Sequence, residues 1–157
     1  MTLDREILRH TVATVAYRGG KAVRGATPEF ADFKAGPATR TPVEILAHIG
    51  DLYDWALSIA KGARTWNNSI PLPWDLEVSR FHATLSAFDA YLASDAVLAA
   101  PVTKLFQGPV ADSLTHAGQL TLLRGIAGQP VRGESYFMSA IEAGRVGPDQ
   151  ASPKVEF

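Results

Sequence analysis

The sequence predicts an all-α protein: an antiparallel four-helix bundle with long loops, a short C-terminal helix and an irregular tail. Four segments repeat apolar residues at three- and four-residue spacing, and glycine- and proline-rich breaks separate them. No stretch shows the alternation typical of a half-buried strand. The 157 residues suit one domain, covering 1–157, and a 46% hydrophobic content is enough for a core.

The first helix is predicted over residues 3–23, where Gly19 and Gly20 weaken its end. Its apolar residues are Ile7, Leu8, Val12, Val15 and Ala16. The second helix has a clear start, because Thr41 is a good N-cap, Pro42 fits the first helical position and Glu44 completes a capping box.

The second helix ends near Gly62, and its predicted seam places a polar residue, His48, in an apolar stripe. The members of that stripe are Ile45, His48, Leu52, Trp55 and Ile59. The third helix is predicted over residues 74–93, with the most regular seam in the chain. Its members are Trp74, Val78, Phe81, Leu85, Phe88 and Leu92.

Pro109 suits the first turn of a fourth helix, which runs to about Ala127 and stops at the Gly-Gln-Pro of residues 128–130. A short helix near residues 134–140 and an irregular tail over the bundle complete the predicted fold.

The composition argues against several classes of partner and of metal site. The net charge is −1 and no basic stripe is present, so we expect no nucleic-acid partner. No apolar run reaches the roughly 18 residues of a membrane span, and acidic residues near Met1 replace the basic end of a signal peptide. We therefore expect a cytoplasmic protein with no membrane partner. Cysteine is absent, so His, Asp or Glu must hold any metal.

Asp112 and His116 lie four residues apart, on one face of the fourth helix, and Gln119 continues that face. We expect this face to point at least partly inward, with His48 opposite it. Two histidines and one aspartate make up a facial triad, a metal site with open coordination positions. Gln119 could orient a ligand or a bound water. The plainer alternative is a buried Asp–His ion pair and a hydrogen-bonded core histidine.

Other residues receive structural interpretations. His10 and His82 fit partly exposed packing positions. Trp55, Trp66 and Trp74 could line a ligand pocket, but Trp55 and Trp74 also fit the core, which is the preferred interpretation for them. Arg124 complements a helix dipole more readily than it binds an anionic substrate. The C-terminal segment offers two further side chains within possible reach of the site, Glu134 and Tyr136.

The segment TPVEILAHI at residues 41–49 resembles the second helix of DinB-like (damage-inducible) proteins, which carries a metal-binding histidine. The segment LTHAGQL at 114–120, with Leu123-Arg124 and Gly128 after it, resembles that family's fourth helix. The tail motifs, Tyr136-Phe137 and GRVGPD at 144–149, resemble a tail found in some members.

The resemblance implies that His48 and His116 bind a divalent metal: Zn, Ni, Fe or Mn. Asp112 stands where the family usually has a histidine, which either makes the site more oxygen-rich or marks the loss of the metal. The resemblance also implies a small-molecule substrate and a metal-assisted transferase or isomerase that uses a low-molecular-weight thiol. The alternative is a non-catalytic small-molecule-binding or stress-response bundle with a His/Asp polar core and no metal.

Relatives in that family often form two-fold dimers, so we also expect a homodimer. The apolar stripes leave Leu57, Phe106 and Val110 as candidate surface contacts.

Overall fold

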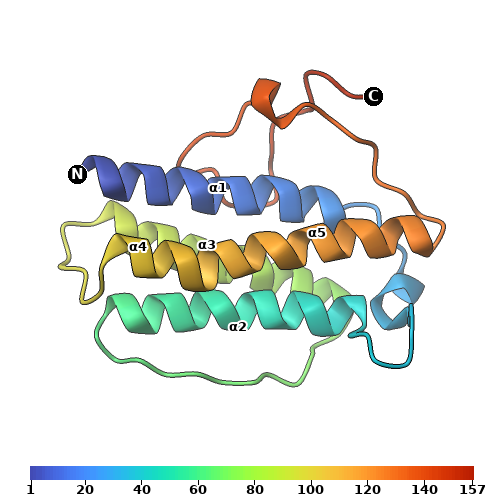
Figure 1. The fold of residues 1–157 in the computed structure, drawn as a ribbon, viewed down its shortest axis with the longest axis horizontal. Helices are drawn as coiled ribbons and strands as arrows, with labels where there is room; N and C mark the ends of the chain where they lie inside the picture. The colour runs from blue at the N-terminus through green and yellow to red at the C-terminus, as the bar shows by residue number, and fades with distance from the viewer.

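The computed structural model describes residues 1–157 and contains four long helical segments and no β-strand (Figure 1). The first three are α1 (Leu3–Val23), α2 (Pro42–Ala60) and α3 (Trp74–Ala93). The fourth is composite and consists of α4 (Val102–Leu105), a π-helical turn (Phe106–Val110) and α5 (Ala111–Ile126). The only ladder contact is an isolated bridge between Glu134 and Glu156.

The helices do not alternate in direction along the chain. In Figure 1, α1 and α5 run from left to right, whereas α2 and α3 run from right to left. Contacts agree, because Tyr91 near the end of α3 donates a hydrogen bond to the carbonyl of Ala60 at the end of α2. Arg124 near the end of α5 likewise donates to the carbonyl of Ala22 near the end of α1. Residues 61–73 cross the length of the bundle and make this arrangement possible.

The predicted capping box of α2 is confirmed. The backbone N–H of Thr41 donates to the Glu44 carboxylate at 2.6 Å, and the Glu44 N–H donates to the Thr41 hydroxyl at 3.4 Å. Two of the orphan donors of the helix start are satisfied in this way. The predicted bounds of α1 and α3 also match the structure.

The predicted start of the fourth helix is wrong, because the helix begins at Val102 rather than at Pro109. Pro109 lacks an N–H and would break a regular helix, whereas here it lies inside the π-helical turn. Leu105 and Val110 are both fully buried although they lie five residues apart. A regular α-helix would point such positions about 140° apart, so the wider turn lets both reach the core.

The seam of α3 is buried as predicted except at Val78, which is partly buried. The buried face of α2 is shifted by about one position, and only Ile45 and Leu52 of the predicted stripe are buried. The fully or almost fully buried residues of α2 include Leu46, Ile49, Tyr53, Ala56 and Ala60. Of the predicted stripe, His48, Trp55 and Ile59 are only partly buried. His48 therefore lies at the edge of the core, where a polar side chain can meet solvent or a ligand.

Gly19 does not weaken the end of α1 but lets α1 approach α3 closely. A Cβ atom at this position would lie 2.7 Å from the Phe81 ring. The glycine is buried, and the ring fills the space that a side chain would need. Packing against α3 thus explains a residue that helix propensity alone counts as unfavourable.

The C-terminal segment contains a 3₁₀ turn (Tyr136–Met138) instead of the predicted helix near 134–140. The rest is irregular, as predicted, and passes over α1 (Figure 1). Its anchor is Glu134, which accepts hydrogen bonds from Tyr17 and Lys21 of α1.

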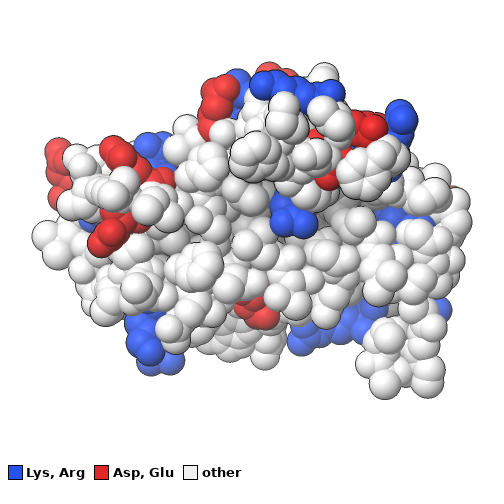
Figure 2. All heavy atoms as spheres, turned by 45° about the horizontal axis from the view of Figure 1, so that its top comes forward, with Lys and Arg blue, Asp and Glu red and all other residues white.

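Fewer of the candidate dimer-contact residues are exposed than expected. Val110 is fully buried and Leu57 is partly buried, so of the three candidates only Phe106 is exposed. The homodimer stays a prediction. On the face shown in Figure 2, lysines and arginines form small groups separated by uncharged surface. None of the helices combines the length and the apolar character needed to traverse a membrane.

Candidate metal centre

The three predicted ligands meet where α2 faces α5. His48 comes from α2, while Asp112 and His116 come from successive turns of α5. One ligand atom of each lies within 4.8 Å of the other two. The Asp112 carboxylate oxygens lie 3.6 Å from His48 Nε2 and 3.5 Å from His116 Nε2. The imidazole ring centroids are 4.7 Å apart, and the ring planes are nearly perpendicular at 87°.

A buried hydrogen bond fixes the register of the two helices beside this triad. Tyr53 and Ser113 are fully buried, and their hydroxyl oxygens lie 2.8 Å apart. Ser113 directly follows Asp112, so this link holds the start of α5 against α2. Sequence reasoning did not identify the pair, because a tyrosine and a serine sixty residues apart carry no shared spacing signal.

Gln119 determines which nitrogen of His116 is available. Its Oε1 lies 2.7 Å from His116 Nδ1, so Nδ1–H donates to the amide oxygen. In the neutral tautomer that this hydrogen bond selects, Nε2 carries the lone pair and lies on the side of Asp112. This arrangement matches the predicted role of Gln119 and resembles the partners that orient metal-bound histidines in proteins.

Local electrostatics keep His48 neutral. Burial lowers the pKa of His48, and the nearby His116 and Arg40 lower it further, while the Asp112 carboxylate acts in the opposite direction. A neutral imidazole keeps the lone pair that a metal requires. The environment of His48 therefore favours the protonation state in which it can be a ligand.

The spacing of the triad fits a cation better than direct hydrogen bonds. Distances of 3.5 and 3.6 Å between nitrogen and oxygen exceed those of good N–H···O bonds. Two atoms that each lie about 2.0–2.1 Å from one tetrahedral zinc ion are roughly 3.3 Å apart. A small movement of the side chains would therefore close the triad around an ion.

Asp112 is less buried than predicted. Its side chain is 47% exposed, whereas the side chains of His48 and His116 are 18% and 11% exposed. The expected buried ion pair is therefore wrong, since one partner reaches solvent. The helix face points along the edge of the core, as the displaced seam of α2 also shows.

Two large cavities flank the triad, and a smaller one of about 220 Å³ borders His48. The first large cavity, of about 550 Å³, is lined by His48, Leu52, Trp55, Arg64, Trp66 and Asp112. Trp66 stands edge-on to both His48 and Trp55, with ring centroids 5.7 and 5.6 Å away. Trp55 is thus a wall of this cavity rather than a core residue, while Trp74 is buried as predicted.

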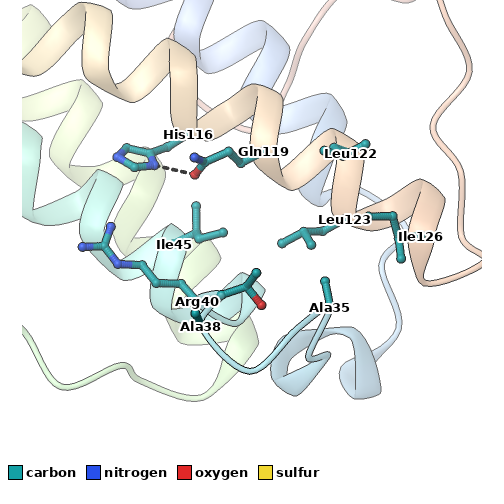
Figure 3. Close-up of a pocket in the computed structure, with 10 residues that line it drawn as sticks. Ala35, Ala38, Arg40, Ile45, His116, Gln119, Leu122, Leu123 and Ile126 are labelled. Carbon is teal, nitrogen blue, oxygen red and sulfur yellow. Dashed lines mark hydrogen bonds between the residues drawn. The ribbon is translucent and has the colours of Figure 1, made fainter.

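The second cavity, of about 450 Å³, lies on the His116 side (Figure 3). Residues of α5 and of the segment before α2 line it, and His116 and Gln119 lie at one end. The triad therefore has open space on two sides. A sealed core, the expected mark of a purely structural His/Asp cluster, is absent.

The crossover segment that carries Trp66 is held by buried carboxylates. Asp51 accepts hydrogen bonds from the backbone N–H and the hydroxyl of Ser69, and Glu77 accepts one from the N–H of Leu72. Arg80 joins both carboxylates. This network places an exposed loop beside the triad, and no motif in the sequence predicted it.

The remaining candidates lie outside the centre. Arg124 donates to three backbone carbonyls, of Ala22, Arg24 and Gln129, so it caps the end of α1 and is not free to bind a substrate. His82 is buried, not partly exposed, and its Nδ1 lies 3.2 Å from the Val146 carbonyl oxygen.

His10 is exposed on α1, which agrees with a role outside the site. Glu134 and Tyr136 contact Tyr17 on α1 and do not reach the triad. Comparison of the chain with protein-family models, with curated proteins and with solved structures finds no match.

Proposed function

We propose that this protein binds a divalent metal ion through His48, Asp112 and His116 and that it is a metal-assisted enzyme acting on a small molecule. One observation carries the proposal: three potential ligand atoms converge within 4.8 Å, next to open cavities. The orientation of His116 by Gln119 supports it.

The residues around the site have separable roles. Asp112 would supply a carboxylate ligand, the two imidazoles would supply nitrogen ligands, and Trp55 and Trp66 form one wall of the cavity beside His48. Three protein ligands leave coordination positions open. A divalent ion held there would act as a Lewis acid and would lower the pKa of a bound water or thiol.

The resemblance of residues 41–49 and 114–120 to DinB-like helices gives the proposal its finer form. On that basis the reaction is a transfer or isomerisation that uses a low-molecular-weight thiol. The ion is Zn, Ni, Fe or Mn, because mixed nitrogen and oxygen ligands suit all four. A cytoplasmic homodimer belongs to the same proposal.

A second candidate is a non-catalytic small-molecule-binding or stress-response bundle without a metal. The position of Asp112 favours this second candidate. Its carboxylate lies between two imidazoles and would form an ion pair with either imidazole when that imidazole is protonated. In this case the cavities bind a ligand without converting it.

Metal analysis separates the two. The purified protein, and protein titrated with Zn²⁺ or Ni²⁺ after chelator treatment, should bind about one ion per chain by inductively coupled plasma mass spectrometry and calorimetry. His116→Ala should abolish this binding. His10→Ala is the matched control, since His10 is exposed on another helix. Equal metal binding by both variants, or none by the wild type, would rule out the metal centre.

Turnover tests the enzymatic part. Metal-loaded protein is mixed with an electrophile and with bacillithiol, mycothiol or glutathione, and loss of the free thiol is followed. The proposal expects turnover that chelation stops and metal restores. Unchanged turnover in His116→Ala would remove the metal centre from the mechanism.

A further inference from the structure

The cavity on the His116 side is polar at one end and apolar at the other (Figure 3). His116, Gln119 and the Arg40 guanidinium lie at the polar end. The apolar end is formed by Ala35, Leu122, Leu123 and Ile126. Its volume of about 450 Å³ is in the range of small-molecule sites.

The apolar wall includes side chains that are exposed and are not packed in the core. Leu122 and Ile126 are 63% and 56% exposed, and they lie four residues apart on the same face of α5. Ala35 faces them from the segment before α2 (Figure 3). Large apolar side chains gathered on a surface cavity are typical of a binding site.

Arg40 is a cation at the polar end, and two carboxylates, those of Glu44 and Asp51, share a neighbouring cavity with it. Hydrogen bonds from Thr41 lower the pKa of Glu44, and the Arg40 charge contributes to this shift. No salt bridge joins it to a carboxylate, in contrast to Arg9 and Arg80. The acid nearest along the chain, Glu44, is engaged by the N–H of Thr41 in the capping box. No acidic residue lines this cavity. The polar end therefore favours an anion.

Gln119 adds a donor to the same end. Its oxygen is engaged by His116, which leaves its amide N–H groups for another acceptor. Guanidinium and amide donors together suit a carboxylate, which accepts several hydrogen bonds and pairs well with arginine.

We propose that this cavity binds an aliphatic carboxylate, with the carboxylate at Arg40 and Gln119 and the hydrocarbon chain against Leu122, Leu123 and Ile126. The inference rests on the proposed function and names its substrate class: an organic anion with a flexible apolar tail. The triad borders the carboxylate end, so the atoms nearest the head group are those that the metal centre reaches.

A chain-length series tests the tail. Butanoate, hexanoate and octanoate are titrated into chelator-treated and into Zn²⁺-loaded protein by calorimetry. Each added methylene should tighten binding roughly fourfold until the cavity is full. Ala35→Phe should weaken octanoate more than butanoate, because Ala35 lies on a loop and its replacement fills the apolar end without entering the core.

A charge comparison tests the head group. Arg40→Gln should weaken octanoate binding roughly tenfold and leave binding of 1-octanol unchanged. Arg64→Gln is the matched control, because Arg64 lines only the other cavity. Its octanoate affinity should equal that of the wild type.

The failures of the two proposals are distinguishable. Affinities independent of chain length, or equal losses in Arg40→Gln and Arg64→Gln, would overturn the carboxylate site even if Zn²⁺ binds. Loss of Zn²⁺ binding in the wild type with an intact carboxylate series would overturn the metal centre and leave the cavity assignment standing.

Discussion

Two carboxylates with cationic or polar neighbours behave differently in this molecule. Glu134 is buried and fully engaged: one oxygen accepts from Lys21 at 2.7 Å, and the other accepts from Tyr17 and Ser139 at 2.8 Å each. Asp112 is half exposed, and its oxygens stay 3.5 and 3.6 Å from the nearest imidazole nitrogens.

The difference separates a carboxylate whose acceptor positions are all occupied from one whose acceptor positions are still free. A carboxylate whose lone pairs are all used stabilises the fold and has no capacity left for a ligand. A carboxylate that lies near two imidazoles without a close hydrogen bond to either keeps that capacity. We expect substitutions at Glu134 to affect stability, and substitutions around Asp112 to affect metal binding.

The largest effect should follow Glu134→Ala. Lys21 is buried and would keep only Glu156, at 3.9 Å, as a partner. Leaving one charge of a buried pair without its partner costs about 3 kcal/mol or more of unfolding free energy. Urea unfolding measures this loss, and Glu156→Ala, which removes only the longer contact, should cost clearly less. Similar losses in the two variants would contradict the contrast.

Acid should weaken the same cluster. Burial alone would raise the pKa of Glu134, but hydrogen bonds from Lys21, Tyr17 and Ser139 outweigh it, and the pKa is lowered below 4.5. The contribution to stability is therefore complete above pH 4.5 and is lost as the pH falls through the lowered pKa. Urea unfolding from pH 6 to pH 3 should show this loss in the wild type. In a Glu134→Gln variant the unfolding free energy should fall less steeply with decreasing pH. Identical pH dependence in the two proteins would contradict this role of Glu134.

Asp51→Asn should release the crossover segment. It removes the charge that joins Arg80 to Ser69, at a cost of about 2 kcal/mol for charged hydrogen bonds. Arg80 keeps Asp54 and Glu77, so the core should remain folded. Limited proteolysis should then cut residues 61–73 faster than in Asp54→Asn, where the segment stays bound. Equal cutting rates would show that Asp51 does not hold the segment.

Gln119→Leu should weaken metal binding about tenfold, because His116 loses the acceptor that fixes its Nδ1–H. Competition with a chromophoric chelator measures the affinity. Gln119→Glu should restore it, since a carboxylate also accepts this hydrogen bond. Gln119 is exposed, so the unfolding free energy should hardly change. Unaltered metal affinity in Gln119→Leu would show that Gln119 does not orient the ligand.

The smallest effect on stability should follow Asp112→His. The side chain is 47% exposed, and exposed ion pairs contribute about 1 kcal/mol or less. Metal binding should survive or tighten, because a third imidazole is a good ligand. A fall in melting temperature that added Zn²⁺ does not reverse would instead indicate that Asp112 serves as a structural ion pair.

The sequence predicted those features of the helices that depend on residues close together in the chain. The capping box at Thr41 and Glu44 fixed the start of α2, and the regular stripe of α3 fixed its buried face. The fourth helix was mistaken because a proline usually begins a helix, whereas Pro109 lies within a π-helical turn. The displaced seam of α2 arose because Leu46 and Ile49 fit a helical stripe as well as Ile45 and Leu52 do.

The meeting of His48, Asp112 and His116 was predicted because the spacing on one helix is a local property, and because His48 is a polar residue in an apolar stripe of the facing helix. Of the surroundings, only Trp66 was named as a possible pocket residue without a preferred place in the core, because most of the others come from loops. Trp66 and Arg64 reach the triad through the crossover segment, and Arg40 reaches it from the chain before α2. Helical periodicity carries no information on where such loops return, so Trp55 was assigned to the core instead of to a cavity wall.

The π-helical turn at Phe106–Val110 also determines the direction in which the side chains of α5 point. A helix that takes one extra residue in a turn is rotated by about 100° relative to an uninterrupted one. Removing a single residue such as Gly108 would rotate α4 and α5 relative to each other. Either Leu105 of α4 or Asp112 and His116 of α5 would then point in another direction. The meeting of His48 with Asp112 and His116 thus depends on the wider turn, and a chain with a regular helix here would separate them within the same bundle.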